Sequence, residues 1–316
     1  MVSGKQVKLY LVDGTPGGLL TAEIMGWTGH VLKGGRDKLG EIRQRREAQR
    51  TGVYVLLGED AESAGGRLAY IGQSDNVGNR LAQHEAKKEF WTEVAIVTSK
   101  DENLTSAHVR YLESRLVRMA KSIGRIPLTN GNEPTGGADL PESDAAYMDT
   151  FVDELRIVLP VLGVDLFRGR ESRQAGPGAS PSESPHAVPA PTVVQESPVF
   201  RLRLAKLGVD AQAQVVDGEF TVLSGSLVSA VMRAPVRQVP SSAKQFAARG
   251  EIHARMMEDA TLGEPGALAR LNRDVVFTSP SAAAAVVQGR ATANGRIDWA
   301  TADGVTYADW ENRGVE

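Results

Sequence analysis

The spacing of hydrophobic residues predicts strands in the first half of the chain. Residues 6–12 alternate between polar and apolar positions, and residues 93–98 form a further β-type run. Residues 52–57 and 68–73 are two short apolar runs, and each carries one tyrosine. The polar, glycine-containing residues 58–67 between these two runs predict a connecting loop.

Helical periodicity predicts that helices accompany these strands. A polar helix is expected over residues 36–49, and Asp75 can cap a second helix that runs to about residue 88. Thr105 can cap a third helix that stops at Gly124, and a fourth over residues 142–158 should be ended by Pro160. The third helix has one buried stripe, formed by Val109, Leu112, Leu116, Met119 and Ile123. Strands and helices in this order predict an α+β domain.

A change of composition divides the chain. Residues 168–198 contain 6 of the 15 prolines and much serine, alanine and glycine, so they bury too little apolar surface to fold alone. We interpret this segment as a semi-stiff linker; a peptide ligand for another domain is the alternative. The predicted parts are an N-terminal extension (1–50), a first domain (51–167), this linker (168–198) and a C-terminal domain (199–316).

The C-terminal part predicts a separate small α+β domain. Strands are expected over residues 199–205 and 212–223, with a hairpin turn at Asp217-Gly218, and a helix is expected over residues 243–259. An alanine-rich helix should open at Ser279-Pro280. Turns at residues 294–295 and 303–304 should separate short strands, one of which carries Trp299.

Composition narrows the chemistry. The chain has 316 residues, of which 41% are hydrophobic, and a net charge of −3, which argues against a globally basic coat protein for nucleic acid. It has no cysteine, which excludes disulfides, thiol catalysis and cysteine-based zinc sites. No apolar signal core begins the chain and no apolar run is long enough to span a bilayer, so a cytoplasmic protein without membrane contact is expected.

Several side chains in the first domain could carry chemistry. Arg80 and His84 are four residues apart and share a helix face, and Glu113 lies at the edge of the buried stripe, as a metal-binding carboxylate could. The two strand tyrosines are Tyr54 and Tyr70. The set lacks the paired acids of a glycosidase, a serine nucleophile elbow and a phosphate-cradling glycine loop. It suits phosphodiester hydrolysis, which needs a base, a cation for the developing charge and help for the leaving oxygen.

The order of these residues resembles the GIY-YIG nuclease family. Gly52-Val53-Tyr54 is followed by Tyr70-Ile71-Gly72, and then, over residues 80–132, come Arg80 with His84, Tyr111-Leu112-Glu113 and an asparagine. Valine replaces isoleucine in the first triplet. The resemblance implies a small three-stranded antiparallel sheet flanked by helices, and an activity that cuts DNA with one divalent metal, usually Mg²⁺, with Mn²⁺ as a substitute.

The resemblance also implies roles for single residues. Glu113 would bind the metal and Arg80 the scissile phosphate, for which a fixed charge and fork geometry are suited. Tyr54 and Tyr70 would act on the attacking water or the phosphate, and His84 would take a proton or position a tyrosine. The active-site asparagine would be Asn130, with Asn132 as the alternative. His108 is expected to be structural.

Basic residues suggest where nucleic acid could lie. If the chain is a nuclease, the best candidates for contacts with the DNA backbone are Arg45, Arg46, Arg110, Arg115, Arg118 and Lys121. For Arg110, Arg115, Arg118 and Lys121, a helix face exposed to solvent is the alternative interpretation.

The C-terminal part resembles a domain of unknown function found after some GIY-YIG modules and, more weakly, the domain associated with restriction enzymes and adenine methylases. The resemblance rests on the segment from Ser279 to Trp299. A packing module with Trp299 in its core is the alternative to a reader of DNA. We expect a metal-dependent DNA endonuclease; the alternative is a non-catalytic nucleic-acid-binding protein. Activity on RNA and the oligomeric state stay open.

Overall fold

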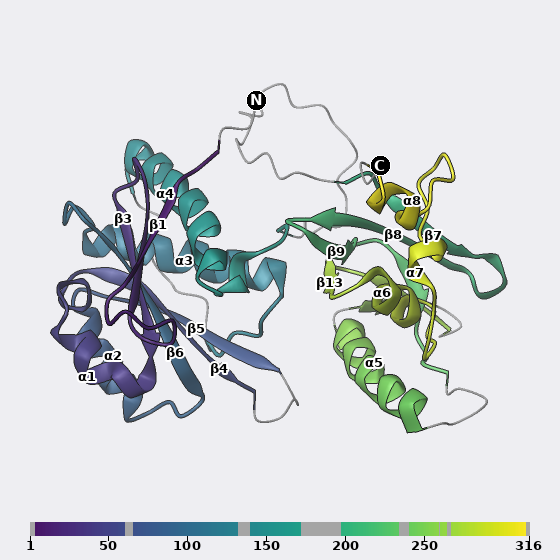
Figure 1. Ribbon diagram of the computed structural model, residues 1–316, viewed down its shortest axis with the longest axis horizontal. Coiled ribbons are helices and arrows are strands. Elements are labelled where there is room, and N and C mark those ends of the chain that lie inside the picture. The colour runs from purple at the N-terminus through teal and green to yellow at the C-terminus, as the bar shows by residue number, and fades with distance from the viewer. Residues whose placement is uncertain are drawn as a thin grey trace. The chain divides into compact units, whose positions relative to one another are not determined.

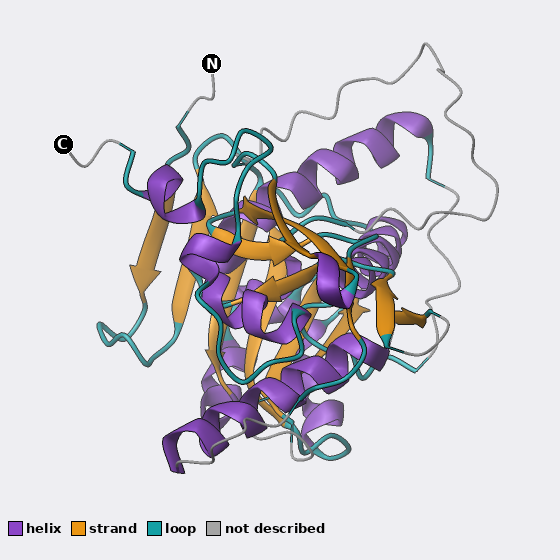
Figure 2. Cartoon of the chain, turned by 90° about the vertical axis from the view of Figure 1, so that its right-hand side faces the viewer, coloured by secondary structure: helices purple, strands orange, loops and turns teal. Residues whose placement is uncertain are grey.

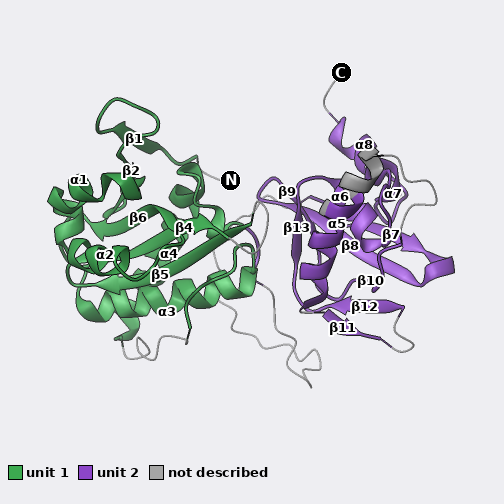
Figure 3. Ribbon diagram, turned by 90° about the horizontal axis from the view of Figure 1, so that it is seen from below, with its two compact units in different colours: residues 1–168 green, residues 169–316 purple. Residues whose placement is uncertain are grey.

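The computed structural model describes residues 4–60, 66–131, 140–171, 197–233, 240–258, 260–263 and 267–313, with backbone only at 240–245 and 248. The chain forms two compact units, Met1–Arg168 and Gly169–Glu316 (Figures 1 and 3). Each unit has its own antiparallel sheet, and helices pack against the strands (Figure 2). The expectation of an α+β protein with a separate C-terminal domain is therefore confirmed. Most of the predicted linker and Asn132 lie outside the described residues.

The first unit contains a six-stranded sheet in the order β1-β2-β3-β6-β4-β5. Every neighbouring pair is antiparallel. This is not the three-stranded sheet that the resemblance implies: β4, β5 and β6 are three of its six strands, and the first 35 residues of the chain supply the other three. The strands are β1 (Val7–Leu11), β2 (Leu20–Ile24), β3 (Gly29–Gly35), β4 (Gly52–Glu59), β5 (Arg67–Ser74) and β6 (Trp91–Ser99).

The strands β2 and β3 were not predicted. Strand β3 contains three glycines, and glycine is uncommon in strands. The glycines have a packing reason. A Cβ atom on Gly29 would come within 2.0 Å of the Trp27 ring, and one on Gly34 within 2.3 Å of the Leu19 side chain. These positions stay bare because a large side chain covers each of them.

The helices of the first unit lie on both faces of the sheet. They are α1 (Leu39–Gln44), α2 (Val77–Glu85), α3 (Ser106–Ile123) and α4 (Glu142–Val161), with short 3₁₀ turns η1 (Arg36–Lys38), η2 (Arg46–Gln49) and η3 (Asp165–Phe167). One core contains α3 and α4 with one face of the sheet, and a second core contains α1 and α2 with the other face. The strand β5 at the edge is therefore flanked by α2 on one side and α3 on the other.

Three expected helix boundaries are wrong. The helix expected over residues 36–49 is divided into η1, α1 and η2, because Arg45 has an extended backbone with φ −79° and ψ 147°. The cap of α2 is Asn76, whose side chain accepts from the amide of Asn79 at 3.0 Å, and not Asp75. Helix α4 continues past Pro160 to Val161, because Gly163, with φ +76°, provides the turn after the last helical residues. The Thr105 cap and the Gly124 stop of α3 are confirmed.

The second unit contains a sheet of seven antiparallel strands, with β8 near its centre. The strands are β7 (Phe200–Leu204), β8 (Val209–Val216), β9 (Glu219–Val222), β10 (Leu227–Ser229), β11 (Ala260–Leu262), β12 (Leu268–Leu271) and β13 (Val275–Phe277). A 3₁₀ turn, η4 (Ala205–Leu207), follows β7. The turn at Asp217-Gly218 is confirmed, with φ of 51° and 78° at its two residues.

The helices of the second unit are α5 (Pro240–Glu258), α6 (Pro280–Val287), α7 (Gly295–Asp298) and α8 (Tyr307–Glu311). The predicted Ser279 cap of α6 is confirmed, since its side chain accepts from the amide of Ala282 at 3.1 Å. The short strands expected around residues 294–304 are wrong. Helix α7 starts after Asn294, and Ala300 makes only isolated bridges, to Arg201 and Thr306.

Candidate active site

The two strand tyrosines lie on one face of the paired strands β4 and β5. Tyr54 is directly opposite Gly72, and Tyr70 is opposite Leu56, so the tyrosines are diagonal neighbours with ring centroids 6.3 Å apart. The ring of Tyr54 covers Gly72: a Cβ atom there would lie 2.3 Å from the Tyr54 hydroxyl. Gly72 therefore leaves the space into which the phenol of Tyr54 is inserted.

Tyr54 is the inner of the two phenols. Its side chain is fully buried, and its hydroxyl lies 2.8 Å from Nε2 of His84, which α2 supplies. Burial, the largest cause, raises the pKa of Tyr54 well above its usual value, so the phenol is protonated at neutral pH. Burial and the nearby cations Arg80, Lys88 and Lys87 lower the pKa of His84 to about 4. A neutral histidine can accept a hydrogen bond from the hydroxyl.

Tyr70 is the outer phenol and is only half-buried. Its ring meets His84 edge-on, with centroids 5.1 Å apart. Burial first, and then the Glu113 carboxylate, raise its pKa, while Arg80 and a hydrogen bond with Tyr54 lower it. Hydrogen bonding with Tyr54 in turn raises the pKa of Arg80. Tyr70, Tyr54 and His84 thus form a chain of polar groups with the Arg80 guanidinium beside it.

Glu113 faces the same site from α3. Burial raises the pKa of its carboxyl group, and the charge of Arg80 opposes that shift. Among the described residues no hydrogen bond or ion pair engages this carboxylate, although it is only partly exposed. Within the same residues no group of three or more acidic, histidine or cysteine side chains could hold a metal ion. One partly desolvated carboxylate still fits Mg²⁺, which keeps several waters and takes one or two carboxylate ligands.

Asn130 closes the outer edge of β5 beside Tyr70. Its Oδ1 accepts from the amide of Ile71 at 3.0 Å, and its Nδ2 donates to the carbonyl of Ile71 at 2.8 Å. The preceding residues continue this pattern as backbone, because Leu128 bridges Ala69 in parallel. The amide of Asn130 therefore holds the strand that carries Tyr70, which is a positioning contact.

A cavity of about 300 Å³ opens beside Tyr70. The other residues that line it come from α2 and the chain that follows it: Arg80, Gln83, His84, Lys87 and Lys88. The Nζ atom of Lys88 lies 4.2 Å from the centroid of the Tyr70 ring. We call this space the tyrosine cavity. Sequence reasoning missed Gln83, Lys87 and Lys88, although two adjacent lysines at the end of a helix that carries Arg80 and His84 were a usable signal.

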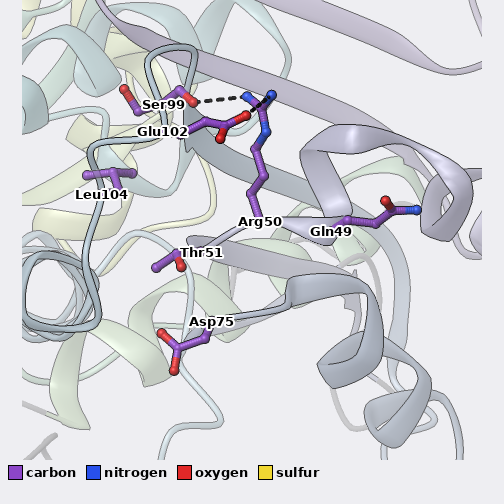
Figure 4. A pocket seen from close by; sticks show the side chains of 7 residues that line it. All are labelled: Gln49, Arg50, Thr51, Asp75, Ser99, Glu102 and Leu104. Carbon is purple, nitrogen blue, oxygen red and sulfur yellow. Dashed lines mark hydrogen bonds and ion pairs between the residues drawn. The ribbon is translucent and has the colours of Figure 1, made fainter.

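A second cavity, of about 230 Å³, lies where β4 begins (Figure 4). Its arginine is paired with a carboxylate. Arg50 forms an ion pair with Glu102 at 2.6 Å and donates to the carbonyl of Ser99 at 3.3 Å. Asp75 accepts from the hydroxyl of Ser106 at 2.5 Å. We call this space the Arg50 cavity.

The predicted DNA-contacting residues fall into different environments. Arg110 is exposed and lies one turn before Glu113, on the same side of α3. Arg115 lies 3.6 Å from Asp149 of α4, and Arg118 donates to the carbonyl of Ser114 within its own helix. Arg46 is exposed, whereas Arg45 is part-buried and paired with Glu47 at 2.8 Å. Lys121 is exposed on the last turn of α3. Of this set, Arg110 is the nearest along a helix face to the carboxylate.

His108 and Trp299 both have structural surroundings. His108 completes the capping box of α3, where its Nδ1 accepts from the amide of Thr105 at 3.2 Å. Trp299 is fully buried in the second unit and packs on Phe220 with ring centroids 5.3 Å apart. Its Nε1 donates to the carbonyl of Pro280 at 3.0 Å. The Trp299 ring is therefore part of the core and is not exposed to stack on a base.

Comparison with known proteins identifies part of the second unit. Residues 200–311 match the family model described as a domain of unknown function (DUF4357). The match confirms the expected C-terminal domain of unknown function and does not reach residues 51–132, which carry the nuclease resemblance. No curated protein and no solved structure gives a significant match to the chain. No helix among the described residues is long and apolar enough to cross a membrane.

Proposed function

We propose that this protein is a metal-dependent DNA endonuclease that hydrolyses phosphodiester bonds through a GIY-YIG active site. The observation that carries the proposal is the convergence of Tyr54, Tyr70, Arg80, His84 and Glu113 on the edge strand β5, from three separate parts of the chain. Packing alone gives no reason to hold an unpaired carboxylate, a guanidinium and two phenols together.

Arg80 binds the scissile phosphate in this proposal. Its guanidinium lies beside both phenols and opposes the raised pKa of Glu113. A guanidinium stays charged at every physiological pH and can donate two parallel hydrogen bonds to phosphate oxygens. It therefore orients the phosphate and stabilises the negative charge that develops on it in the transition state.

The phenols and His84 move the proton of the attacking water. Tyr70 borders the tyrosine cavity, so its hydroxyl meets the water, while Tyr54 is buried behind it. The water proton passes to Tyr70, the Tyr70 proton to Tyr54, and the Tyr54 proton to Nε2 of His84, which is neutral at pH 7. The water oxygen bonds to phosphorus, the bond from phosphorus to the leaving sugar oxygen breaks, and that oxygen takes a proton from solvent.

Glu113 would hold the divalent cation, with water and phosphate oxygens as the other ligands. A bound Mg²⁺ or Mn²⁺ would supply positive charge against the charge that builds up on the phosphoryl group. The carboxylate fits this task because burial disfavours its charged form and the described residues leave it without a hydrogen bond or ion pair. A bound cation would stabilise the charged form of the carboxylate.

Nicking of supercoiled plasmid tests the proposal, with Mg²⁺ or Mn²⁺ against EDTA. We expect nicking that depends on metal, is lost in Glu113→Ala and is strongly slowed in Tyr70→Phe. DNA binding that is sensitive to salt and equal in the wild type and Glu113→Ala, without nicking, would instead favour a non-catalytic binding protein. Competition with RNA of the same sequence separates DNA from RNA as the substrate.

A further inference from the structure

One wall of the tyrosine cavity is built by the end of α2 and the residues after it. The amides of Lys87 and Lys88 both donate to the carbonyl of His84, at 3.1 Å and 2.8 Å. The two lysines are therefore tied by backbone to a residue of the candidate active site. They line the cavity together with Arg80, and no acidic residue is among the described residues that line it.

Arg36, from the N-terminal part of the chain, fixes this wall. Its guanidinium donates to the carbonyls of Glu85, Lys88 and Glu89, at 2.9, 3.0 and 3.2 Å, and more weakly to that of Trp91 at 3.4 Å. Its Cζ atom also lies 4.9 Å from the ring centroid of the fully buried Trp91. Because one rigid group binds so many carbonyls, the conformation of residues 85–91 is set before any ligand arrives.

The charges of this wall are uncompensated. Neither lysine has an ion pair among the described residues, and Lys88 is held over the Tyr70 ring, 4.2 Å from its centroid. Placing like charges close together is unfavourable without a counter-ion. A cavity lined by Arg80, Lys87 and Lys88 therefore favours an anion with more than one charged group.

We propose that Lys87 and Lys88, with Gln83 beside them, bind a second phosphate of the nucleic-acid strand, next to the phosphate held by Arg80. The proposal rests on the proposed function, because it assigns a place to the strand on either side of the bond that is cut. Contacts of this kind fix the register of the strand without reading its sequence.

Binding of the strand would also change the pKa of His84, the proposed proton acceptor. The ionisable groups that face His84 are Tyr54 of β4, Tyr70 of β5, and Arg80, Lys87 and Lys88 of α2 and its C-terminal end. After burial, the three cations are the causes that lower the pKa of His84. A phosphate bound between them offsets their charge, so the bound strand itself makes His84 a stronger base.

Binding of the full chain to labelled oligonucleotides in EDTA tests the proposal without catalysis. Lys87→Gln/Lys88→Gln is compared with Lys8→Gln/Lys206→Gln, which removes two exposed lysines elsewhere and gives the same change of net charge. We expect the first pair to weaken binding about tenfold and to lower the slope of log K against log salt by about one, and the control to change neither. In nicking assays KM should rise.

The outcomes separate this proposal from the proposed function. If the wild type nicks DNA and both double variants bind and cut alike, the second phosphate site is overturned and the endonuclease stands. If the wild type does not nick, but the Lys87/Lys88 variant alone loses affinity and slope, the phosphate site stands and the endonuclease fails. If the wild type neither nicks nor binds, both are overturned.

Discussion

Each of the two cavities of the first unit is lined by an arginine. Only one of these arginines forms an ion pair with a carboxylate that lines the same cavity. In the Arg50 cavity the guanidinium is paired with Glu102 at 2.6 Å and with a backbone carbonyl (Figure 4). Arg80, Lys87 and Lys88 line the tyrosine cavity without a carboxylate. Glu113, whose charge interacts with that of Arg80, is not in this lining and has no ion pair among the described residues. The arginine of one cavity already has its counter-ion, whereas the cations of the other gain one when an anion enters.

This difference indicates which charges are there for stability and which for a ligand. A charge that is paired inside the protein gains little from a ligand, because the existing pair would have to be broken. Unpaired charges that are partly desolvated are unfavourable to keep, and they gather at functional sites. Matched substitutions in the two cavities test this distinction.

Removing the carboxylate that interacts with each arginine should give the largest contrast. Glu113→Gln keeps the size of the side chain and removes the charge, so we expect plasmid nicking to fall by about 10²–10³-fold, as when a group that stabilises transition-state charge is lost. Glu102→Gln in the Arg50 cavity should leave nicking within about twofold. Equal losses in the two variants would mean that the cavities do not differ in function.

Replacing the arginine of each cavity by lysine should give a smaller contrast. Arg80→Lys keeps the charge and loses the fork that binds two phosphate oxygens, so the nicking rate should fall about tenfold to a hundredfold. Arg50→Lys should not slow nicking, since its partners are Glu102 and the Ser99 carbonyl. Slow nicking by an Arg50→Lys variant with an unchanged melting temperature would contradict the comparison.

Filling the space under Tyr54 should affect both stability and activity. In Gly72→Ala the new methyl group meets the Tyr54 hydroxyl at 2.3 Å, and we expect a loss of about 1–3 kcal/mol in unfolding free energy, as overpacked cores show. Gly40→Ala, where no atom lies within 4 Å, is the matched control and should be neutral or slightly stabilising. Denaturant unfolding of both variants measures the difference. A stable and fully active Gly72→Ala variant would show that the Tyr54 ring is free to move.

A further effect is expected in the pH dependence of stability. The folded pKa of His84, about 4, lies below the ordinary value of 6.5, so between these two pH values the unfolded chain binds a proton that the folded chain does not. The stabilising contribution of neutral His84 is thus complete above pH 6.5 and is lost as the pH falls to about 4. The difference in unfolding free energy between the wild type and His84→Gln should narrow as the pH falls through this window. The difference between the wild type and Arg50→Lys should stay constant. A constant gap for His84→Gln would contradict the lowered pKa.

The sequence predicted those parts of the site that depend on local periodicity. Two β-type runs form β4 and β5, and the helix spacing puts Arg80 and His84 together, which the structure bears out. It did not predict that Tyr54 is packed against Gly72 while Tyr70 borders a cavity. That asymmetry arises from the packing of α2 over the sheet, and no local pattern encodes it.

The contacts that hold the site join distant parts of the chain, and therefore they escaped prediction. Arg36 binds carbonyls 49 to 55 residues away, and Asn130 binds Ile71 across 59 residues. In the sequence Arg36 is one of several basic residues in a polar segment. Glycine-rich β3 likewise gave no strand signal, because its pairing with β6 and its packing under Trp27 and Leu19 override the weak strand propensity of glycine.

Because β6 pairs with β3, the sheet that carries the candidate site depends on residues before position 51. This strand comes last in its sheet's sequence order, yet it pairs with β3 over Gly29–Gly35 on one side and with β4 on the other. A fragment that starts at residue 51 would keep every residue of the candidate site and would expose the backbone of β6 along seven positions, with the apolar contacts of Val31 and Leu32 removed. An open edge of this kind recruits other chains and aggregates. The piece that can be inherited or produced as a stable unit is therefore longer than the motif that gives the site its chemistry.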